Sequence, residues 1–265
     1  MSTPGTFSPD WLALRETADA AARAVDLLGP LRAHLADAPT PLVIRDLGCG
    51  TGSLGRWLTG WLPRPQHWIL HDRDPELLVR AGATMTASGA SVETRQGDIT
   101  SLTAADLAGT SLVTASALLD LLTAPELDGL ANAIAGAGCP ALLALSVVGR
   151  IELVPPDPFD AAFAAAFNAH QHRGSLLGPD AVTAATLMFE RLGATVWNSP
   201  SPWRLGRDQA ALAEAWLRGW VGAACEESPD LPGETYLRQR LGTLAAGELN
   251  VVVQHRDLLI LPGAS

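Results

Sequence analysis

The sequence predicts an α/β fold, with a doubly wound and mostly parallel seven-stranded sheet that carries helices on both faces. Short apolar runs typical of buried strands alternate with helical periodicity from residue 41 onward. A glycine-rich turn follows the first run, and glycine or proline separates most later segments. Because 48% of the 265 residues are apolar and only 17% are charged, the chain can bury a large core.

The N-terminal residues 1–38 are predicted to be helical and to form a lid on the sheet. Ser8-Pro9-Asp10 is a typical helix start, with serine at the N-cap and proline in the first turn. Apolar residues from Trp11 to Leu28 recur at helical spacing, and Gly29-Pro30 is expected to stop this helix. A second short helix is expected over residues 31–36.

Alternating strands and helices are predicted after the Pro39–Pro41 break. Apolar runs predict five strands over residues 41–48, 67–72, 91–98, 111–116 and 141–149. Helical periodicity predicts helices between them over residues 53–60, 75–88 and 125–135. This repeated unit is the signature of a parallel sheet with covered faces.

The regular alternation is interrupted after the fifth strand. The segments predicted there are a short strand over 150–154, a helix over 158–169, a polar stretch over 170–174, a helix over 179–193, a sixth strand over 194–200, helices near 208–224 and 233–246, and a last strand ending at Pro262. Since no linker or internal repeat divides the chain, residues 1–265 are predicted to form one domain. Residues 40–150 carry the regular alternation, and residues 151–178 and 207–248 are predicted to be insertions into this domain.

Charge and composition exclude several classes of partner. The net charge of −10, without any basic run, disfavours nucleic acid, and no segment is apolar for long enough to span a membrane. The chain contains no lysine, which excludes lysine-based catalysis. Cys49, Cys139 and Cys225 are widely spaced, and the start of the chain does not resemble a signal peptide. We therefore expect a cytoplasmic protein without a metal site; whether it forms a homodimer is left open.

The glycine turn favours a cationic cofactor. Gly48, Gly50 and Gly52 form a G-x-G-x-G pattern between a strand and a helix, where a plain tight turn is the alternative. The dinucleotide fingerprint needs its third glycine at the position of Ser53. Asp46, two residues before the first glycine, would repel a pyrophosphate but suits a sulfonium or ammonium group.

This D-x-G-x-G-x-G pattern resembles the first motif of the class I S-adenosylmethionine-dependent methyltransferases. The resemblance implies that an acidic residue ending the second strand binds the ribose hydroxyls, and Asp72 holds that place, twenty residues after Gly52. Asp74 is the rival, but D-x-x-P-x-x-L matches better with Asp72 as ligand and Asp74 as helix cap. The resemblance also implies that Asp98 and Ile99 contact adenine, although Gly-Asp could be a simple turn.

The motifs together cover residues 40–150, and the segment 114–120 is expected beneath the transferable methyl group. The full set of predicted cofactor-binding residues is Arg15, Asp46, Gly48, Cys49, Gly50, Gly52, Asp72, Arg73, Asp98, Ile99 and Ser116. Cys49 is expected to be a small filler in the loop, and Arg15 could contact the cofactor's carboxylate or the acceptor. A solvated Arg15–Glu16 pair is the alternative for that position.

The acceptor side is predicted from polar residues near the strand ends. His170 and His172, with Arg173, could supply a base and an anion clamp, but a solvated helix end is equally compatible with this pattern. Asp120 follows the fourth strand and could act as a base or as a helix cap. Weaker acceptor-side candidates are Glu152, Trp203, Trp216 and Trp220. Trp216 and Trp220 lie four residues apart on one helix face, which favours packing or a dimer contact over an aromatic acceptor cage. An open acceptor pocket would be walled by residues 11–16, 116–120 and 150–177. The resemblance makes residues 40–150 the cofactor-binding half, and the insertions over 151–178 and 207–248 are expected to cap the acceptor site.

These features predict an enzyme that transfers a methyl group from S-adenosylmethionine to a small-molecule acceptor at O, N or C. Two alternatives remain open. A cofactor-binding scaffold or partner subunit would bind S-adenosylmethionine without turnover. A NAD(P)-dependent oxidoreductase is disfavoured by Ser53 and Asp46.

Overall fold

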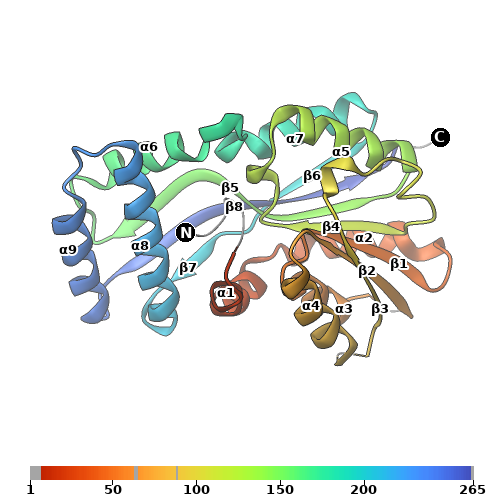
Figure 1. Cartoon of the computed structure of the whole chain (residues 1–265), viewed down its shortest axis with the longest axis horizontal. Coiled ribbons are helices and arrows are strands. Elements are labelled where there is room, and N and C mark those ends of the chain that lie inside the picture. The colour runs from red at the N-terminus through yellow and green to blue at the C-terminus, as the bar shows by residue number, and fades with distance from the viewer. Residues whose placement is uncertain (1–6, 63–64, 88, 264–265) are drawn as a thin grey trace.

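The computed structural model describes residues 7–62, 65–87 and 89–263. Figure 1 shows a sheet covered by helices and, beside it, a group of helices around the projecting ends of two long strands. The strands are β1 (Leu42–Leu47), β2 (Gln66–Asp72), β3 (Ser91–Gln96), β4 (Leu112–Ser116), β5 (Ala141–Val154), β6 (Thr195–Pro200), β7 (Trp203–Leu205) and β8 (Asn250–Leu261).

The sheet has the order β3-β2-β1-β4-β5-β8-β6, with β7 paired to β8 beside this path. Neighbours from β3 to β5 are parallel, whereas β8 runs antiparallel to β5 and β6. This confirms the predicted mostly parallel sheet. Its seven predicted strands are present, and the short β7 adds an eighth that the sequence did not predict.

Helices cover both faces of the sheet, as the sequence predicts. The helices are α1 (Pro9–Ala22), α2 (Leu28–His34), α3 (Ser53–Thr59), α4 (Pro75–Ala87), α5 (Ala124–Ala137), α6 (Asp160–Gln171), α7 (Ala181–Arg191), α8 (Ala210–Glu227) and α9 (Gly233–Ala245). Helices α5 and α7 pack on one face, and α2, α3 and α4 on the other. Position 88, the last residue of the helix predicted over residues 75–88, lies outside the described residues. No described helix is long and apolar enough to cross a membrane.

The N-terminal helix begins as predicted but ends earlier. Ser8 caps α1 by accepting a hydrogen bond from the Trp11 N–H at 3.2 Å. The helix stops at Ala22 because Arg23 is extended and the Ala24 N–H donates to the Asp257 carboxylate at 2.9 Å. Gly29-Pro30, the predicted stop, instead lies in the first turn of α2. Proline is tolerated there because first-turn N–H groups have no partner within a helix.

The long strand β5 corrects a second prediction. Residues 150–154 are not a separate strand but the continuation of β5, past two register shifts against β8. At the first shift Leu145 has a φ of +55°, and its N–H donates to Asp257 Oδ1 at 2.7 Å. Because the bulged residue finds this buried acceptor, the strand continues instead of ending. Asp257 thereby joins the bulge in β5 to the end of α1.

The projecting ends of β5 and β8, with β7, α6, α8 and α9, form what we call the C-terminal lobe. Aromatic rings pack in its core. Trp216 stacks on Trp220 with 5.1 Å between ring centroids, and Phe163 stacks on Tyr236 with 4.1 Å between ring centroids. The predicted helical insertions after the fifth and sixth strands thus pack together as one body (Figure 1). The C-terminal lobe lies next to α1, because α1 contacts β7.

Candidate active site

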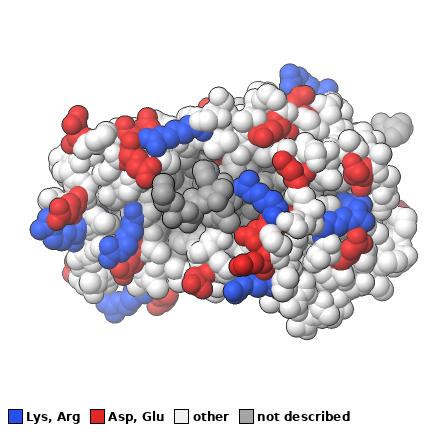
Figure 2. Space-filling view, in the orientation of Figure 1, with Lys and Arg blue, Asp and Glu red and all other residues white. Residues whose placement is uncertain are grey.

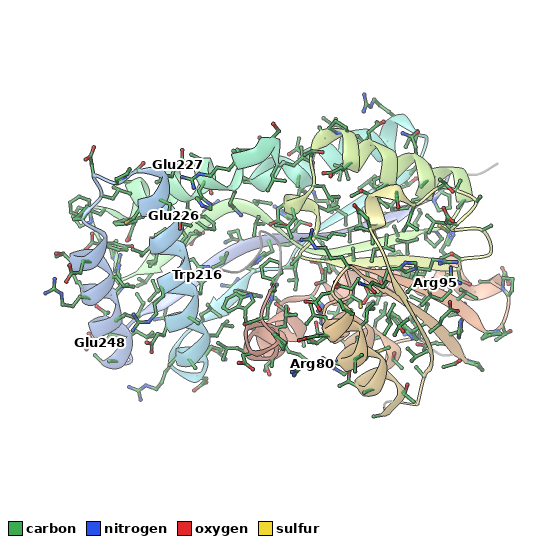
Figure 3. The ribbon with its side chains drawn as sticks, in the orientation of Figure 1. Arg80, Arg95, Trp216, Glu226, Glu227 and Glu248 are labelled. Carbon is green, nitrogen blue, oxygen red and sulfur yellow. The ribbon has the colours of Figure 1, made fainter. Side chains whose placement is uncertain are left out.

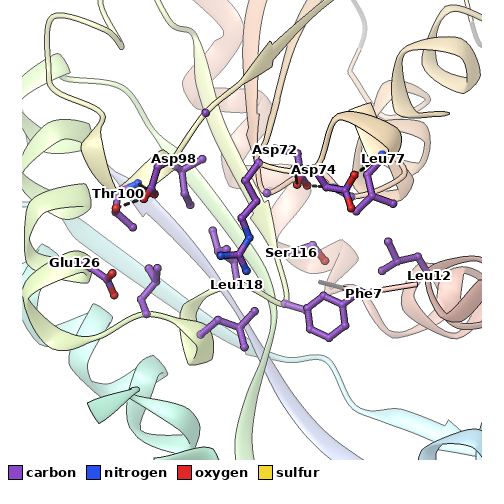
Figure 4. A pocket seen from close by; sticks show the side chains of 18 of the residues that line it. Phe7, Leu12, Asp72, Asp74, Leu77, Asp98, Thr100, Ser116, Leu118 and Glu126 are labelled. Carbon is purple, nitrogen blue, oxygen red and sulfur yellow. Dashed lines mark hydrogen bonds between the residues drawn. The ribbon is translucent and has the colours of Figure 1, made fainter. Parts of the chain in front are cut away.

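A cavity of about 220 Å³ lies at the carboxyl ends of β1, β2, β3 and β4. Open parallel sheets place ligands at this edge. Figure 4 shows Asp98 and Thr100 on one side of the cavity and Asp72, Asp74 and Leu77 across from them, with Phe7, Ser116 and Leu118 between. The predicted cofactor residues that line it are Arg15, Gly48, Gly50, Asp72, Arg73, Asp98, Ile99 and Ser116.

The glycine loop brings its backbone close to the cavity. Gly48 has a φ of +63° and Gly50 a φ of +55°, in the left-handed region that favours glycine. A Cβ atom on Gly48 would lie 3.1 Å from the Leu118 side chain, and one on Gly50 would lie 3.2 Å from Leu12. Side chains at these two positions would therefore crowd the cavity. Gly52, the N-cap of α3, does not line it.

Two carboxylates lie at the end of β2, Asp72 as its last residue and Asp74 two residues later, and they have different hydrogen-bond partners. Asp74 caps α4, since its Oδ1 accepts from the Glu76 N–H at 2.8 Å. Asp72 is mostly buried; its Oδ2 accepts from the Gly50 N–H at 2.9 Å and its Oδ1 from the Asp74 N–H at 3.0 Å. The cap predicted for Asp74 is therefore confirmed. Asp72 faces the cavity beside the glycine loop, on the side where the sequence predicted a ribose ligand.

Asp98 lies across the cavity, after β3. Its Oδ1 accepts from the Thr100 N–H at 2.9 Å and from the Thr100 hydroxyl at 2.8 Å, and these bonds lower the pKa of the carboxyl group. The side chain thus holds the turn that begins at Ile99 while lining the cavity. The two readings of Gly-Asp, turn and ligand-facing residue, are compatible here. Arg73 lies close enough to stabilise the charge on Asp98.

A smaller cavity of about 50 Å³ continues beneath the glycine loop, and Asp46 lines it. Asp46 is 1% exposed, and its Oδ1 accepts from the Thr114 hydroxyl at 2.8 Å. Its Oδ2 has no hydrogen-bond partner among the described residues. Burial raises the pKa of Asp46 to about 7, against the opposing effects of Thr114 and Arg23. A buried carboxylate oxygen without a partner is costly, so this pocket suits a cationic ligand.

Cys49 lines the same small cavity and is buried. Burial and the nearby carboxylates Asp46 and Asp72 raise the pKa of its thiol far above its ordinary value. A neutral thiol of this kind is a poor nucleophile. These properties agree with the predicted role of a small filler in the loop.

Arg15 borders both cavities from α1. Its Nε donates to Asp19 Oδ2 at 2.9 Å and Oδ1 at 3.2 Å, and its side chain is only 12% exposed. Glu16, the expected partner in a solvated pair, instead accepts from Arg56 on α3 at 2.6 and 2.8 Å. The solvated-pair alternative is therefore wrong, and Arg15 is held inside the cleft.

Asp120 lies in a short turn after β4, between Leu119 and Leu121. Its Oδ1 is buried without a hydrogen-bond partner among the described residues, and burial raises the pKa of the carboxyl group to about 6. Thr123, not Asp120, caps α5 by accepting from the Glu126 N–H, and Glu126 completes the capping box. The helix-cap alternative for Asp120 is wrong, because the helix begins too late for it.

His170 and His172 lie at the C-terminal end of α6, away from the residues that line the two cavities. His170 Nε2 lies 3.2 Å from Glu226 Oε2, and Arg173 donates to Glu227 at 2.7 Å. Figure 3 shows Glu226 and Glu227 at the end of α8 that faces α6. Figure 2 shows similar mixtures of arginine and carboxylate over the drawn surface. These contacts favour the alternative of a solvated, polar helix end.

The sequence did not single out Asp19, and it offered Trp203 only as a weaker candidate on the acceptor side. Trp203 Nε1 donates to Asp19 Oδ1 at 2.9 Å, and the Arg15 guanidinium carbon lies 4.9 Å from the Trp203 ring centroid. The spacing of Arg15 and Asp19, four residues apart on one helix, could have indicated their pairing. Nothing in the sequence brings Trp203 to them, because that contact depends on where β7 lies. The pairing of Trp216 with Trp220 is confirmed as core packing.

No group of three side chains suited to a metal ion is present among the described residues. The region from 150 to 177, predicted to wall an acceptor pocket, lines neither cavity. Leu12 and Arg15 from the predicted wall 11–16 do so, as do residues 116–118. Of the predicted pocket walls, those that line the larger cavity are thus the N-terminal helix and the end of β4.

Residues 44–138 match the family model of a methyltransferase domain. No curated protein sequence matches the chain. Among solved structures, the chain is similar to the cyclopropane synthase MmaA2 from Mycobacterium tuberculosis, with a TM-score of 0.55, 11% identity, and coverage of 96% of this chain and 94% of that one. It is also similar to BH2331 from Bacillus halodurans, provisionally named a methyltransferase, with a TM-score of 0.52, 15% identity, and coverage of 88% and 96%. At these identities the two structures show a shared fold.

Proposed function

We propose that the protein transfers a methyl group from S-adenosylmethionine to a small-molecule acceptor, because residues 44–138 match the family model of a methyltransferase domain. The observation that carries this proposal is the unpartnered, buried Oδ2 of Asp46 beneath the glycine loop. The positive charge of an ammonium or sulfonium group would compensate the buried negative charge of this carboxylate. A neutral or anionic ligand does not.

The side chains around the two cavities fit the parts of this cofactor in order. The small cavity offers Asp46 to the ammonium group and Arg15 to the carboxylate of the amino-acid end. The larger cavity offers Asp72 to the ribose hydroxyls, with Asp98 and Ile99 beside the place for adenine. Gly48 and Gly50 leave room for the chain that joins the two ends, since a Cβ at either position would crowd the cavity.

A dinucleotide fits this site less well. A pyrophosphate at the glycine loop would lie beside the carboxylates of Asp46 and Asp72. Such like-charge contacts in a buried site weaken binding strongly. Ser53 also occupies the position where the dinucleotide fingerprint has glycine.

The cofactor supplies an electrophilic methyl group on a positively charged sulfur. The chain's contribution is to orient both reactants and to exclude water, which is how positioning lowers the barrier of a displacement. Phe7, Leu12 and Leu118 provide apolar walls around the cavity. Of the three predicted catalytic residues, we retain Asp120 as the group that takes a proton from the acceptor. Asp120 lines neither cavity itself, but it lies between the cavity-lining Leu118 and Leu121 and close enough to Arg15 for that charge to lower its pKa. Its Oδ1 is buried without a partner among the described residues.

Calorimetric titration of the protein with S-adenosylmethionine, S-adenosylhomocysteine and NADH tests this proposal. We expect both adenosyl compounds to bind and NADH not to bind. Asp72→Ala is expected to weaken S-adenosylhomocysteine binding at least tenfold, because a buried hydrogen-bonded carboxylate contributes about 1.5–3 kcal/mol. Asp106→Ala is a matched control, since Asp106 lies on an exposed turn and its carboxylate accepts from the N–H and hydroxyl of Thr103.

Two results would contradict the proposal: binding of NADH in place of S-adenosylmethionine, or an unchanged affinity in Asp72→Ala. A scaffold without catalysis is the second candidate function, and it predicts the same binding without turnover. A screen of small-molecule acceptors with methyl-labelled cofactor separates the two, because only the enzyme releases S-adenosylhomocysteine as an acceptor becomes labelled.

A further inference from the structure

A buried cluster under α1 joins the cofactor cleft to the C-terminal lobe. It consists of Arg15 and Asp19 on α1 and Trp203 on β7. Asp19 and Trp203 are each 3% exposed, so the carboxylate and the indole are both removed from water. Asp19 Oδ1 accepts from both Arg15 Nε and Trp203 Nε1, at 3.2 and 2.9 Å, while Asp19 Oδ2 accepts from Arg15 Nε at 2.9 Å.

In this cluster only the Nε atom of the Arg15 guanidinium donates hydrogen bonds to described residues. Its Nε is bound to Asp19 and its face lies over the Trp203 ring, at 4.9 Å from the centroid. The two Nη groups have no hydrogen-bond partner among the described residues. Because Arg15 lines both cavities, these groups are left for a ligand in the cleft. Paired Nη donors are suited to a carboxylate.

The Trp203 ring is itself fixed by its neighbours. It meets Trp11 edge to face at 6.4 Å and His255 at 5.3 Å, and β7 pairs with β8 so that Trp203 lies opposite Val253. Aromatic contacts of this kind restrict the ring to one orientation. The indole N–H therefore reaches Asp19 from a rigid part of the C-terminal lobe.

We propose that Asp19 and Trp203 are positioning residues that hold Arg15 for the amino-acid carboxylate of the cofactor, so that the C-terminal lobe sets the cofactor's affinity. This inference rests on the proposed function. Without the Trp203 N–H, Asp19 loses one of its donors and can turn with Arg15 away from the cleft. The loss should affect only ligands that carry the carboxylate.

The test compares two ligands on the same full-length protein. S-adenosylhomocysteine carries the amino-acid end, whereas 5′-methylthioadenosine lacks it. Trp203→Phe keeps an aromatic ring and removes the N–H donor. We expect this variant to bind S-adenosylhomocysteine about tenfold more weakly and methylthioadenosine within about twofold of wild type, as for loss of one hydrogen bond to a charged group. Trp216→Phe, a buried tryptophan of the same lobe, should change neither affinity.

A double-mutant cycle guards against a general effect on folding. Arg15→Met removes the guanidinium, so adding Trp203→Phe to Arg15→Met should produce no further loss of S-adenosylhomocysteine affinity. An unchanged S-adenosylhomocysteine affinity in Trp203→Phe, an equal loss for both ligands, or a full additional loss in the double variant overturns the inference. If wild type binds neither ligand, the proposed function fails instead.

Discussion

Two clusters of charged side chains in this molecule resemble each other in composition and differ in their surroundings. Arg15, Asp19 and Asp46 line the small cavity beneath the glycine loop and are nearly inaccessible to solvent. His170, Arg173 and Glu226 lie between the ends of α6 and α8, where Glu226 is 67% exposed. The first cluster leaves polar atoms unpartnered beside a cavity, whereas ion pairs between the two helices account for the second.

This difference teaches that burial and unmet hydrogen bonds indicate a site better than the types of residue do. A charged group in water interacts weakly with its partner, and exposed pairs contribute about 0–1 kcal/mol. A buried charged group must be compensated, by the protein or by a ligand. We therefore place the cofactor at the first cluster and propose Asp120, whose carboxyl group is influenced by the Arg15 charge, as the proton acceptor. The predictions below test this placement, beginning with the largest effect.

Asp120→Asn should lower kcat about 100-fold with little change in KM for either substrate, because a positioned proton acceptor contributes about 10²–10⁴ to the rate. The steady-state rate of methyl transfer measures this once an acceptor is known. Asp128→Asn on the exposed face of α5 is the control. A kcat for Asp120→Asn within about threefold of wild type would remove Asp120 from the catalytic step.

Asp46→Asn should weaken S-adenosylhomocysteine binding about 30-fold, since the neutral amide cannot offset an ammonium group. The variant keeps an oxygen that can accept from the Thr114 hydroxyl, so its fold should be preserved. Calorimetry gives the affinity, and thermal unfolding of the ligand-free protein gives the stability. Equal affinities in the variant and wild type would mean that the ligand's positive charge lies elsewhere.

The pH dependence of cofactor binding follows from the raised pKa of Asp46, which lies at about 7. The cation prefers the ionised carboxylate, so affinity should increase about tenfold per pH unit between pH 5.5 and 6.5 and level off above pH 7.5. The stability of the ligand-free protein should show the opposite trend and decrease as the pH rises. Its stability contribution from this raised pKa is present below the unfolded value near 4 and is lost as the pH rises through 7.

Affinities measured by calorimetry from pH 5.5 to 8.5 test this sign, with Asp46→Asn as the reference. The variant should show a flat profile over the same range, since its amide does not titrate. A wild-type affinity that falls as the pH rises would contradict the assignment of Asp46 to the ammonium group.

His170→Ala and His172→Ala should have the smallest effects, with kcat/KM within about twofold of wild type and stability changed by less than about 0.5 kcal/mol. Both rings lie at an exposed helix end, and their partners are solvated carboxylates. Steady-state kinetics and thermal unfolding measure these changes. A tenfold loss of activity in either variant would restore the catalytic role that the sequence pattern indicates.

The sequence predicted the first half of the fold well, because local signals determine it there. The positions of Asp46, Asp72 and Asp98 follow from strand ends in a parallel sheet, and all three line the two cavities. Trp203 could not be placed, since β7 is a three-residue strand that pairs with β8 nearly fifty residues later. Gly29-Pro30 misled the prediction because a proline in the first turn of a helix and a proline after its end have the same local pattern.

The histidine pattern at residues 170–172 shows a further limit of the sequence. Histidine and arginine at a helix end serve catalysis or the helix itself, and only the path of α8 brings Glu226 and Glu227 to them. Likewise, Asp120 could be a cap or a base until the start of α5 is known. In both cases tertiary contacts, which no local spacing encodes, decide between the alternatives.

The central claim is that Asp46 and Arg15, which line the small cavity, receive the charged end of S-adenosylmethionine. A crystal structure of the protein with S-adenosylhomocysteine tests it most directly. We predict the ligand's ammonium group within hydrogen-bond distance of Asp46 Oδ2, its carboxylate at the Arg15 Nη groups, and its adenosine between Asp72 and Asp98. A ligand bound elsewhere, or one whose amino-acid end points away from Asp46 and Arg15, would contradict the claim.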